Sequence, residues 1–136
     1  MSSRTAQIVG FIRQQCRRHF QQPRPAPSNQ VTRSIQKAAR AHFHGLEDEY
    51  STPGSRLKID LYDSREKVAH ELMFGDGSEI FKNIIKALTL GCSELIVYAR
   101  PYPHRSMSGY GYAKNQLENI AGKLPLKVTL IDFMQE

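Results

Sequence analysis

The chain has little cysteine and no long apolar run. Its two cysteines, Cys16 and Cys92, cannot form a disulfide framework, and both occur in apolar patterns, so we expect buried thiols in a reducing cytoplasm. No window approaches the ~20 apolar residues that a membrane span needs, and arginines interrupt the first 20 residues, where a signal peptide would be unbroken. These absences exclude a disulfide-rich secreted protein and a membrane-spanning one, and predict a globular, cytoplasmic chain with a core of its own.

Acidic residues are missing from the first third of the chain. Of the 19 lysines and arginines, eight fall in residues 1–45, together with none of the 13 aspartates and glutamates. The remaining residues hold the other 11 bases and all 13 acids, so they are nearly neutral. A basic segment joined to a neutral body favours an anionic partner, of which nucleic acid is the commonest. The alternative is a solvated basic surface without a partner.

Hydrophobic periodicity predicts the element order α-α-β-β-β-α-β-α-β. Helices are expected over 5–20, 28–44, 78–90 and 112–123, and strands over 46–51, 56–62, 68–74, 94–99 and 126–133. The prolines in residues 21–27 form a stiff linker, so we expect a basic N-terminal helix and linker, 1–27, joined to an α/β body, 28–136. Two hairpins followed by a β-α-β unit predict a mixed central β-sheet flanked by helices.

Two expectations concern the interior. The helix over 78–90, with Ser78 as its cap, should turn one set of apolar side chains inward: Ile80, Phe81, Ile84, Ile85 and Leu88. His70 falls on an apolar strand face, which is typical of a core histidine that has found a hydrogen-bond partner.

Cationic side chains line one face of the second helix. Arg33, Lys37 and Arg40 follow i, i+4 and i+7 spacing and form one stripe suited to phosphate. In the loop over 100–111, arginine can contact phosphates and tyrosine can stack on bases, which adds three candidate nucleic-acid contacts: His104, Arg105 and Tyr110. For that loop, a packed surface connection whose tyrosines are partial core is the alternative.

Two carboxylates are expected to face each other across a hairpin. Asp60 precedes the polar turn over 63–67 and Glu71 follows it, so the two positions oppose each other approximately, with Cβ atoms about 5 Å apart. Carboxylates this close repel unless a cation lies between them, and oxygen ligands suit Mg²⁺ or Mn²⁺, completed by waters and substrate phosphate. The alternative is a pair of solvated side chains on an exposed hairpin, as in any half-buried sheet.

A family resemblance bears on this pair. The stretch 46–100 resembles the core of the PD-(D/E)XK nuclease superfamily, the restriction-endonuclease-like fold, in which a helix is followed by a three-stranded meander, a helix and a strand. Lys58-Ile59-Asp60-Leu61 is similar to that family's Asp strand, and Ala69-His70-Glu71-Leu72-Met73 to its Glu-x-Lys strand. The resemblance implies a Mg²⁺ or Mn²⁺ site on Asp60, Glu71 and the backbone carbonyl of Leu72, with Glu49 as a helper carboxylate.

Met73 stands where the family has a lysine that orients the water and offsets charge in the transition state. Methionine has neither a charge nor a donor. Lys58, on the strand face of Asp60, or Lys82, in the first turn of the next helix, is expected to replace it as the catalytic cation. Alternatively the chain binds without cutting, or the resemblance is an accident of a common α/β pattern.

The leading hypothesis is a Mg²⁺-dependent DNA endonuclease that acts on double-stranded DNA as a homodimer, with the N-terminal helix at the dimer contact. Two other functions stay open. One is a non-catalytic nucleic-acid-binding subunit with a degenerate nuclease fold. The other is a protein-interaction subunit whose basic N-terminus meets an acidic partner.

Overall fold

The structure is a computed structural model that describes residues 1–101, 109–120 and 122–135. It has the element order predicted from the sequence, and α4 begins earlier than expected. The helices are α1 (Ser3–Phe20), α2 (Ser28–His42), α3 (Glu79–Thr89) and α4 (Gly109–Ile120), and the strands are β1 (Leu46–Tyr50), β2 (Ile59–Asp63), β3 (Val68–Met73), β4 (Glu94–Ala99) and β5 (Lys127–Asp132). None of the helices in this described part is long and apolar enough to cross a lipid bilayer.

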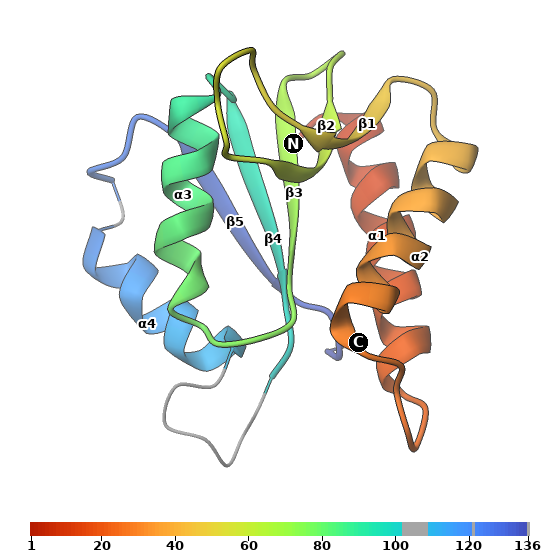
Figure 1. The fold of residues 1–136 in the computed structure, drawn as a ribbon. Helices are drawn as coiled ribbons and strands as arrows, with labels where there is room; N and C mark the ends of the chain where they lie inside the picture. The colour runs from red at the N-terminus through yellow and green to blue at the C-terminus, as the bar shows by residue number, and fades with distance from the viewer. Residues whose placement is uncertain (102–108, 121, 136) are drawn as a thin grey trace.

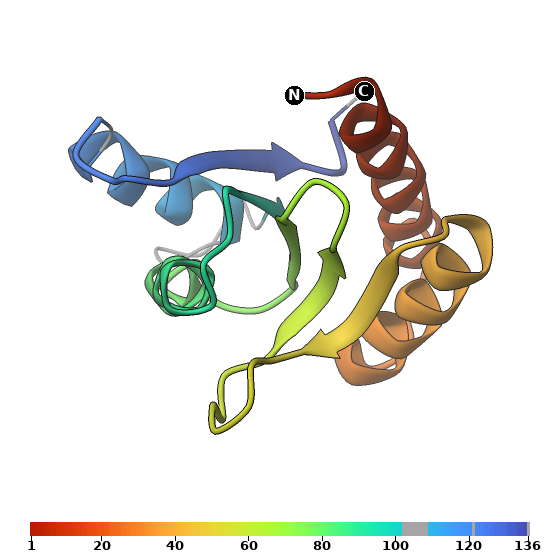
Figure 2. The same cartoon turned by 90° about the horizontal axis from the view of Figure 1, so that it is seen from above.

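The five strands form one mixed sheet in the order β1-β2-β3-β4-β5. The β1–β2 and β2–β3 pairs are antiparallel, because short hairpin connections join them, and the β3–β4 and β4–β5 pairs are parallel, because a helix crosses between their ends. Helices α1 and α2 cover one face of the sheet, and α3 and α4 cover the other (Figures 1 and 2). The predicted mixed sheet flanked by helices is confirmed.

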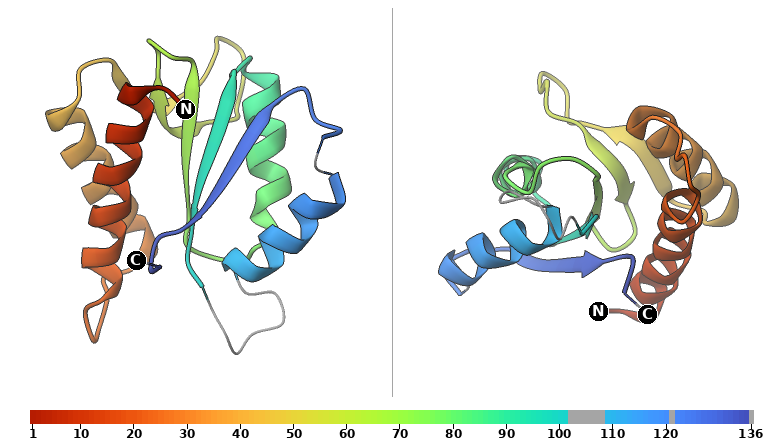
Figure 3. Two further views of the ribbon diagram at one scale, coloured as in Figure 1. Left: turned by 180° about the vertical axis from the view of Figure 1, so that it is seen from behind. Right: turned by 90° about the horizontal axis from the view of Figure 1, so that it is seen from below.

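Helix α1 packs into the core beside α2. Its side chains Ile8, Ile12, Cys16 and Phe20 are buried in the same cluster as residues of α2 and of the sheet. Phe20 reaches residues from the far end of the chain, with its ring centroid 5.5 Å from that of Phe133, and Figure 3 shows the end of β5 running toward α1. The apolar stripe of α1 is therefore used within the chain and is not free for the dimer contact expected of this helix.

The inward face of α3 differs from the expected one. Ile80 and Ile84 are buried as predicted, but Phe81, Ile85 and Leu88 are exposed. Two apolar stripes run along this helix one residue apart, which is about 100° of rotation, so periodicity alone could not choose between them. The buried stripe includes Lys86, whose ammonium group finds partners in the sheet.

Two smaller expectations were wrong. The hydroxyl of Ser78 makes no cap to α3, because the backbone of Ser78 is already helical, with φ of −64° and ψ of −18°, where a capping serine is extended. Cys16 is buried, but Cys92 is only half-buried, since it follows Gly91, whose φ of +72° turns the chain out of the helix.

A buried ion pair fastens the start of α1 to the end of β2. Asp63 is fully buried, and the guanidinium group of Arg4 approaches both of its carboxylate oxygens, at 3.0 and 3.2 Å. Arg4 also donates to the carbonyl of His44. Gly45 leaves the room for this, because a Cβ there would lie 3.1 Å from Arg4 Nη2. The pair thus joins α1, β2 and the α2–β1 connection.

His70 is the core histidine that its apolar strand face predicts. It is fully buried, and its Nδ1 lies 2.9 Å from the hydroxyl of Tyr98 on β4. Burial lowers the pKa of His70 to about 4, with the nearby Asp63 carboxylate opposing the shift and the charge of Arg4 adding to it. The ring is therefore neutral at physiological pH.

Candidate functional site

Asp60 and Glu71 lie on adjacent antiparallel strands, β2 and β3. The register pairs Leu61 with His70 and Tyr62 with Ala69, so one further step brings Asp60 opposite Glu71. Glu71 lies between Ala69 and Met73, which pack in the cluster on the α3 side of the sheet. The juxtaposition expected from the sequence is therefore present on that side.

The two carboxylates differ in their surroundings. Asp60 is half-buried, and its Oδ2 accepts the backbone amide of Leu72 at 2.8 Å. Glu71 is only 3% exposed. Burial raises the pKa of Glu71 to about 8, with repulsion from Asp60 adding to the shift and Lys86 opposing it. Glu71 is thus a buried carboxyl that holds its proton to near neutral pH even with a cation beside it.

Lys86 of α3 brings that cation to the pair. Its Nζ lies 2.9 Å from Glu71 Oε1 and donates to the backbone carbonyl of Lys58 at 3.0 Å. The contact to Glu71 lacks the geometry of a hydrogen bond, and it becomes an ion pair when Glu71 ionises. The lysine side chain is 10% exposed, and its charge needs both partners at that depth.

The two lysines named from the sequence lie elsewhere. Lys58 is exposed, and the atom that it contributes near the site is its backbone carbonyl, which accepts from Lys86. Lys82 is exposed on α3, where its charge acts on Glu79. Met73 is fully buried beneath α3. The side chain that meets the carboxylates is therefore Lys86, one turn beyond Lys82.

Glu49 and Gln36 meet on the β1 side of Asp60. Gln36 is a buried residue of α2, 4% exposed. Its Nε2 donates to the backbone carbonyl of Asp60 at 2.9 Å and to Glu49 Oε2 at 3.3 Å. Glu49 itself is exposed and has a φ of +48°, in the left-handed region. The candidate helper carboxylate is thus linked to Asp60 through the amide of Gln36.

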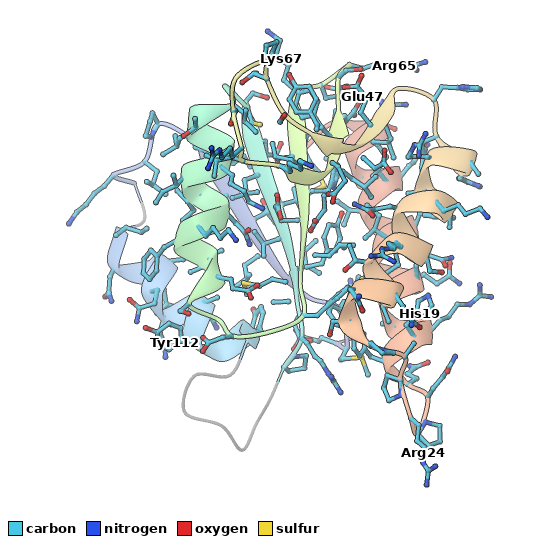
Figure 4. The ribbon with its side chains drawn as sticks, viewed as in Figure 1. His19, Arg24, Glu47, Arg65, Lys67 and Tyr112 are labelled. Carbon is cyan, nitrogen blue, oxygen red and sulfur yellow. The ribbon has the colours of Figure 1, made fainter. Side chains whose placement is uncertain are left out.

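The cationic stripe of α2 faces solvent as expected. Arg33 and Lys37 are exposed, and Arg40 forms a half-exposed ion pair of 3.2 Å with Asp48 of β1. Gln36 lies within the same two turns of helix, so the stripe runs beside the strand that carries Asp60. Figure 4 shows Arg24, also basic, extending from the α1–α2 connection, at the opposite end of the molecule from Arg65 and Lys67 of the hairpin.

Of the three candidate contacts in the loop over 100–111, Tyr110 is among the described residues. Tyr110 lies at the start of α4, where it is half-buried and packs against the cluster on the α3 side. That position fits the reading of the tyrosine as partial core. His104 and Arg105 lie outside the described residues.

The oxygen atoms at the site suit a hard divalent cation. Asp60, Glu71 and the carbonyl of Leu72 are all oxygen donors, and Mg²⁺ commonly takes one or two carboxylates and keeps several waters. Within residues 1–101, 109–120 and 122–135, no group of three or more histidine, cysteine, aspartate or glutamate side chains is arranged to hold a metal. A metal here would therefore rest on two carboxylates, waters and substrate.

Known proteins give no guide to this site. No protein-family model, no characterised protein and no solved structure matches the chain. What the site does must be inferred from its own residues.

Sequence reasoning did not find Lys86 or Gln36. Each is a polar residue on the buried side of an amphipathic helix, and that placement is the signal that could have identified them. A lysine or glutamine that falls on an otherwise apolar stripe must reach a partner across the interface, because burying it alone costs several kcal/mol.

Proposed function

We propose that the chain is a Mg²⁺- or Mn²⁺-dependent endonuclease that cuts double-stranded DNA, with Asp60 and Glu71 as metal ligands and Lys86 as the cation of the site. The observation that carries the proposal is the 2.9 Å contact between Lys86 Nζ and Glu71 Oε1. It supplies from α3 the positive charge that Met73 cannot supply from β3. The run of α2, β1, β2, β3, α3 and β4 also follows the helix, meander, helix and strand order of the PD-(D/E)XK nucleases, which supports the resemblance.

The chemistry divides between the metal and the side chains. A bound divalent metal supplies a polarised phosphoryl oxygen and an acidified water. Asp60, Glu71 and the Leu72 carbonyl would hold it. Lys86 would turn from Glu71 toward the scissile phosphate and offset the charge that develops there, in a site with little water.

The stripe of α2 would hold DNA phosphates on the face of the sheet opposite the carboxylates (Figure 2). Arg33, Lys37 and Arg40 span about 10.5 Å along the helix axis, a length over which one strand of duplex carries about three phosphates. Gln36, between them, touches the backbone of Asp60 at 2.9 Å. A duplex held on the stripe would therefore have to pass around the β1 edge of the sheet for its scissile phosphate to reach the carboxylates on the α3 side.

Cleavage of supercoiled plasmid in Mg²⁺ or Mn²⁺ tests the proposal. Glu71→Ala should abolish cutting, and Lys86→Met should lower the turnover rate by roughly 10²–10³ with little change in DNA affinity, as for other lost transition-state donors. Lys82→Met is the matched control, because Lys82 is exposed one turn away on the same helix, and it should cut normally. We would abandon the proposal if no duplex, single-stranded or branched DNA were cut and calorimetry found no Mn²⁺ binding that Glu71→Ala removes.

Salt dependence tests the DNA interface separately. Log affinity should fall linearly with log salt, by about 0.9 per phosphate neutralised, and Arg33→Ala or Lys37→Ala should each reduce that slope by about one phosphate. Asp48→Asn should strengthen binding, because it releases Arg40 from its 3.2 Å ion pair. A flat salt dependence would favour the protein-interaction function instead.

A non-catalytic DNA-binding subunit is the second candidate, favoured by the depth of the pair, since the side chains of Glu71 and Lys86 are only 3% and 10% exposed. In such a protein the buried pair would neutralise itself and hold α3 on the sheet. DNA binding without cleavage, unaffected by Lys86→Met, would identify it.

The homodimer stays a prediction, motivated by the need for two sites to cut both strands, and sedimentation with and without duplex measures it.

A further inference from the structure

Gln36 reaches from α2 to the backbone of β2 at a place where the β1–β2 register is interrupted. The β1–β2 ladder pairs Asp48 with Leu61 and Tyr50 with Ile59, and Asp60 lies between these two pairs. The side-chain amide of Gln36 donates to the Asp60 carbonyl at 2.9 Å.

The backbone of β1 departs from a regular strand beside Asp60. Glu49 is the β1 residue between the two ladder pairs, and its φ of +48° turns its peptide out of the extended conformation. Gln36 bridges this irregular position, because its second contact, to Glu49 Oε2 at 3.3 Å, keeps the amide nitrogen turned toward the strands.

We infer that Gln36 is a positioning residue for Asp60, and through Asp60 for the site as a whole; the inference rests on the proposed function. The peptide of Asp60 is held from the α2 side by Gln36, and its carboxylate is held from the β3 side by the Leu72 amide at 2.8 Å. Together the two hydrogen bonds fix the side chain opposite Glu71. Neither Gln36 nor Glu49 needs to touch metal or DNA for this role.

The variant that tests the inference is Gln36→Met, which keeps the length of the side chain and removes its donor. Ser34→Ala is the control, since Ser34 is exposed on the same helix and outside the proposed site. Loss of an outer-shell partner typically lowers metal affinity or activity by 10–100-fold. Gln36→Met should therefore weaken Mn²⁺ binding and lower kcat by about that factor, while the Kd for duplex DNA stays at the wild-type value.

Hydrogen exchange of the Leu72 amide supplies a readout that needs neither metal nor cleavage. In wild type this amide is protected by the Asp60 carboxylate, and in Gln36→Met it should exchange about tenfold faster, while the His70 amide on the same strand keeps its protection. Unchanged Leu72 exchange, or Mn²⁺ affinity equal to that of Ser34→Ala, would overturn the inference. Faster Leu72 exchange in a protein that binds no Mn²⁺ would refute the proposed function and leave the positioning role standing.

Discussion

Replacing Glu71 by glutamine should stabilise the metal-free protein, and more so as the pH rises. Glu71 is 3% exposed, and its pKa is raised from 4.5 to about 8 by burial first and by Asp60 second. Glutamine has nearly the shape of the protonated carboxyl, can donate toward Asp60 and never ionises. The substitution therefore leaves the low-pH form of the pair almost unchanged and removes the ionised form.

The sign and size follow from proton linkage. Between pH 4.5 and about 8 the unfolded chain has released the Glu71 proton and the folded chain retains it, so the free energy of unfolding falls as pH rises through this window. A shift of this size, in which the opposing effect of Lys86 is already included, corresponds to about 5 kcal/mol. Glu71→Gln should match wild type near pH 4.5 and exceed it by about 2–5 kcal/mol at pH 8.

Urea unfolding in EDTA at pH 5, 6, 7 and 8 measures the effect. The difference in unfolding free energy should grow by up to about 1.4 kcal/mol for each pH unit. A difference that stays constant with pH would refute the reasoning, because it would mean that Glu71 is already ionised in the folded protein. A Glu71→Gln protein less stable than wild type at every pH would show that Lys86 needs the carboxylate charge, and this result would also refute the reasoning.

Three further outcomes are expected. His70 has a pKa of about 4 in the folded protein against an ordinary 6.5, so its own contribution to stability should fall by about 3 kcal/mol as pH drops through that window. Glu71 titrates with the opposite sign over part of this window, so urea titrations of Glu71→Gln should show the loss, and its persistence when His70→Gln is added would assign it to another group. Arg4→Ala should cost about 3 kcal/mol in denaturant unfolding, since it strands the fully buried Asp63 charge, and a cost no larger than that of Arg18→Ala, an exposed position on the same helix, would contradict this. Ile84→Ala should cost about 2–4 kcal/mol and Ile85→Ala under about 0.5 kcal/mol, because the side chains are 5% and 57% exposed; equal thermal shifts would mean that α3 turns a different face inward.

Local patterns predicted the strands and the opposed carboxylates. The alternation in β2 and β3 and the polar turn between them fix the hairpin, and the hairpin register alone brings Asp60 opposite Glu71. That information lies within a dozen residues of sequence, so no tertiary packing is needed to obtain it.

The cation and the outer hydrogen bonds of the site could not be obtained in the same way. Lys86 and Gln36 reach the strands from two helices on opposite faces of the sheet. Whether a helix turns these residues inward depends on its rotation about its own axis. On α3, periodicity leaves two such rotations open, because the stripe through Ile84 and the stripe through Ile85 are both apolar. The choice is made by packing against the sheet, which one-dimensional periodicity does not contain.

The strand order has a consequence for how the chain is assembled. Because β1 to β5 lie in the sheet in the order of synthesis, each strand can pair with its predecessor as it emerges. Helix α1 is the exception. It is made before the strands, yet Phe20 finds Phe133, and Arg13 the carbonyl of Gln135, only after β5 has been made. The apolar face of α1 is thus the surface that stays uncovered longest in a nascent chain. Aggregation during folding would compete with the step in which this face packs onto the finished sheet.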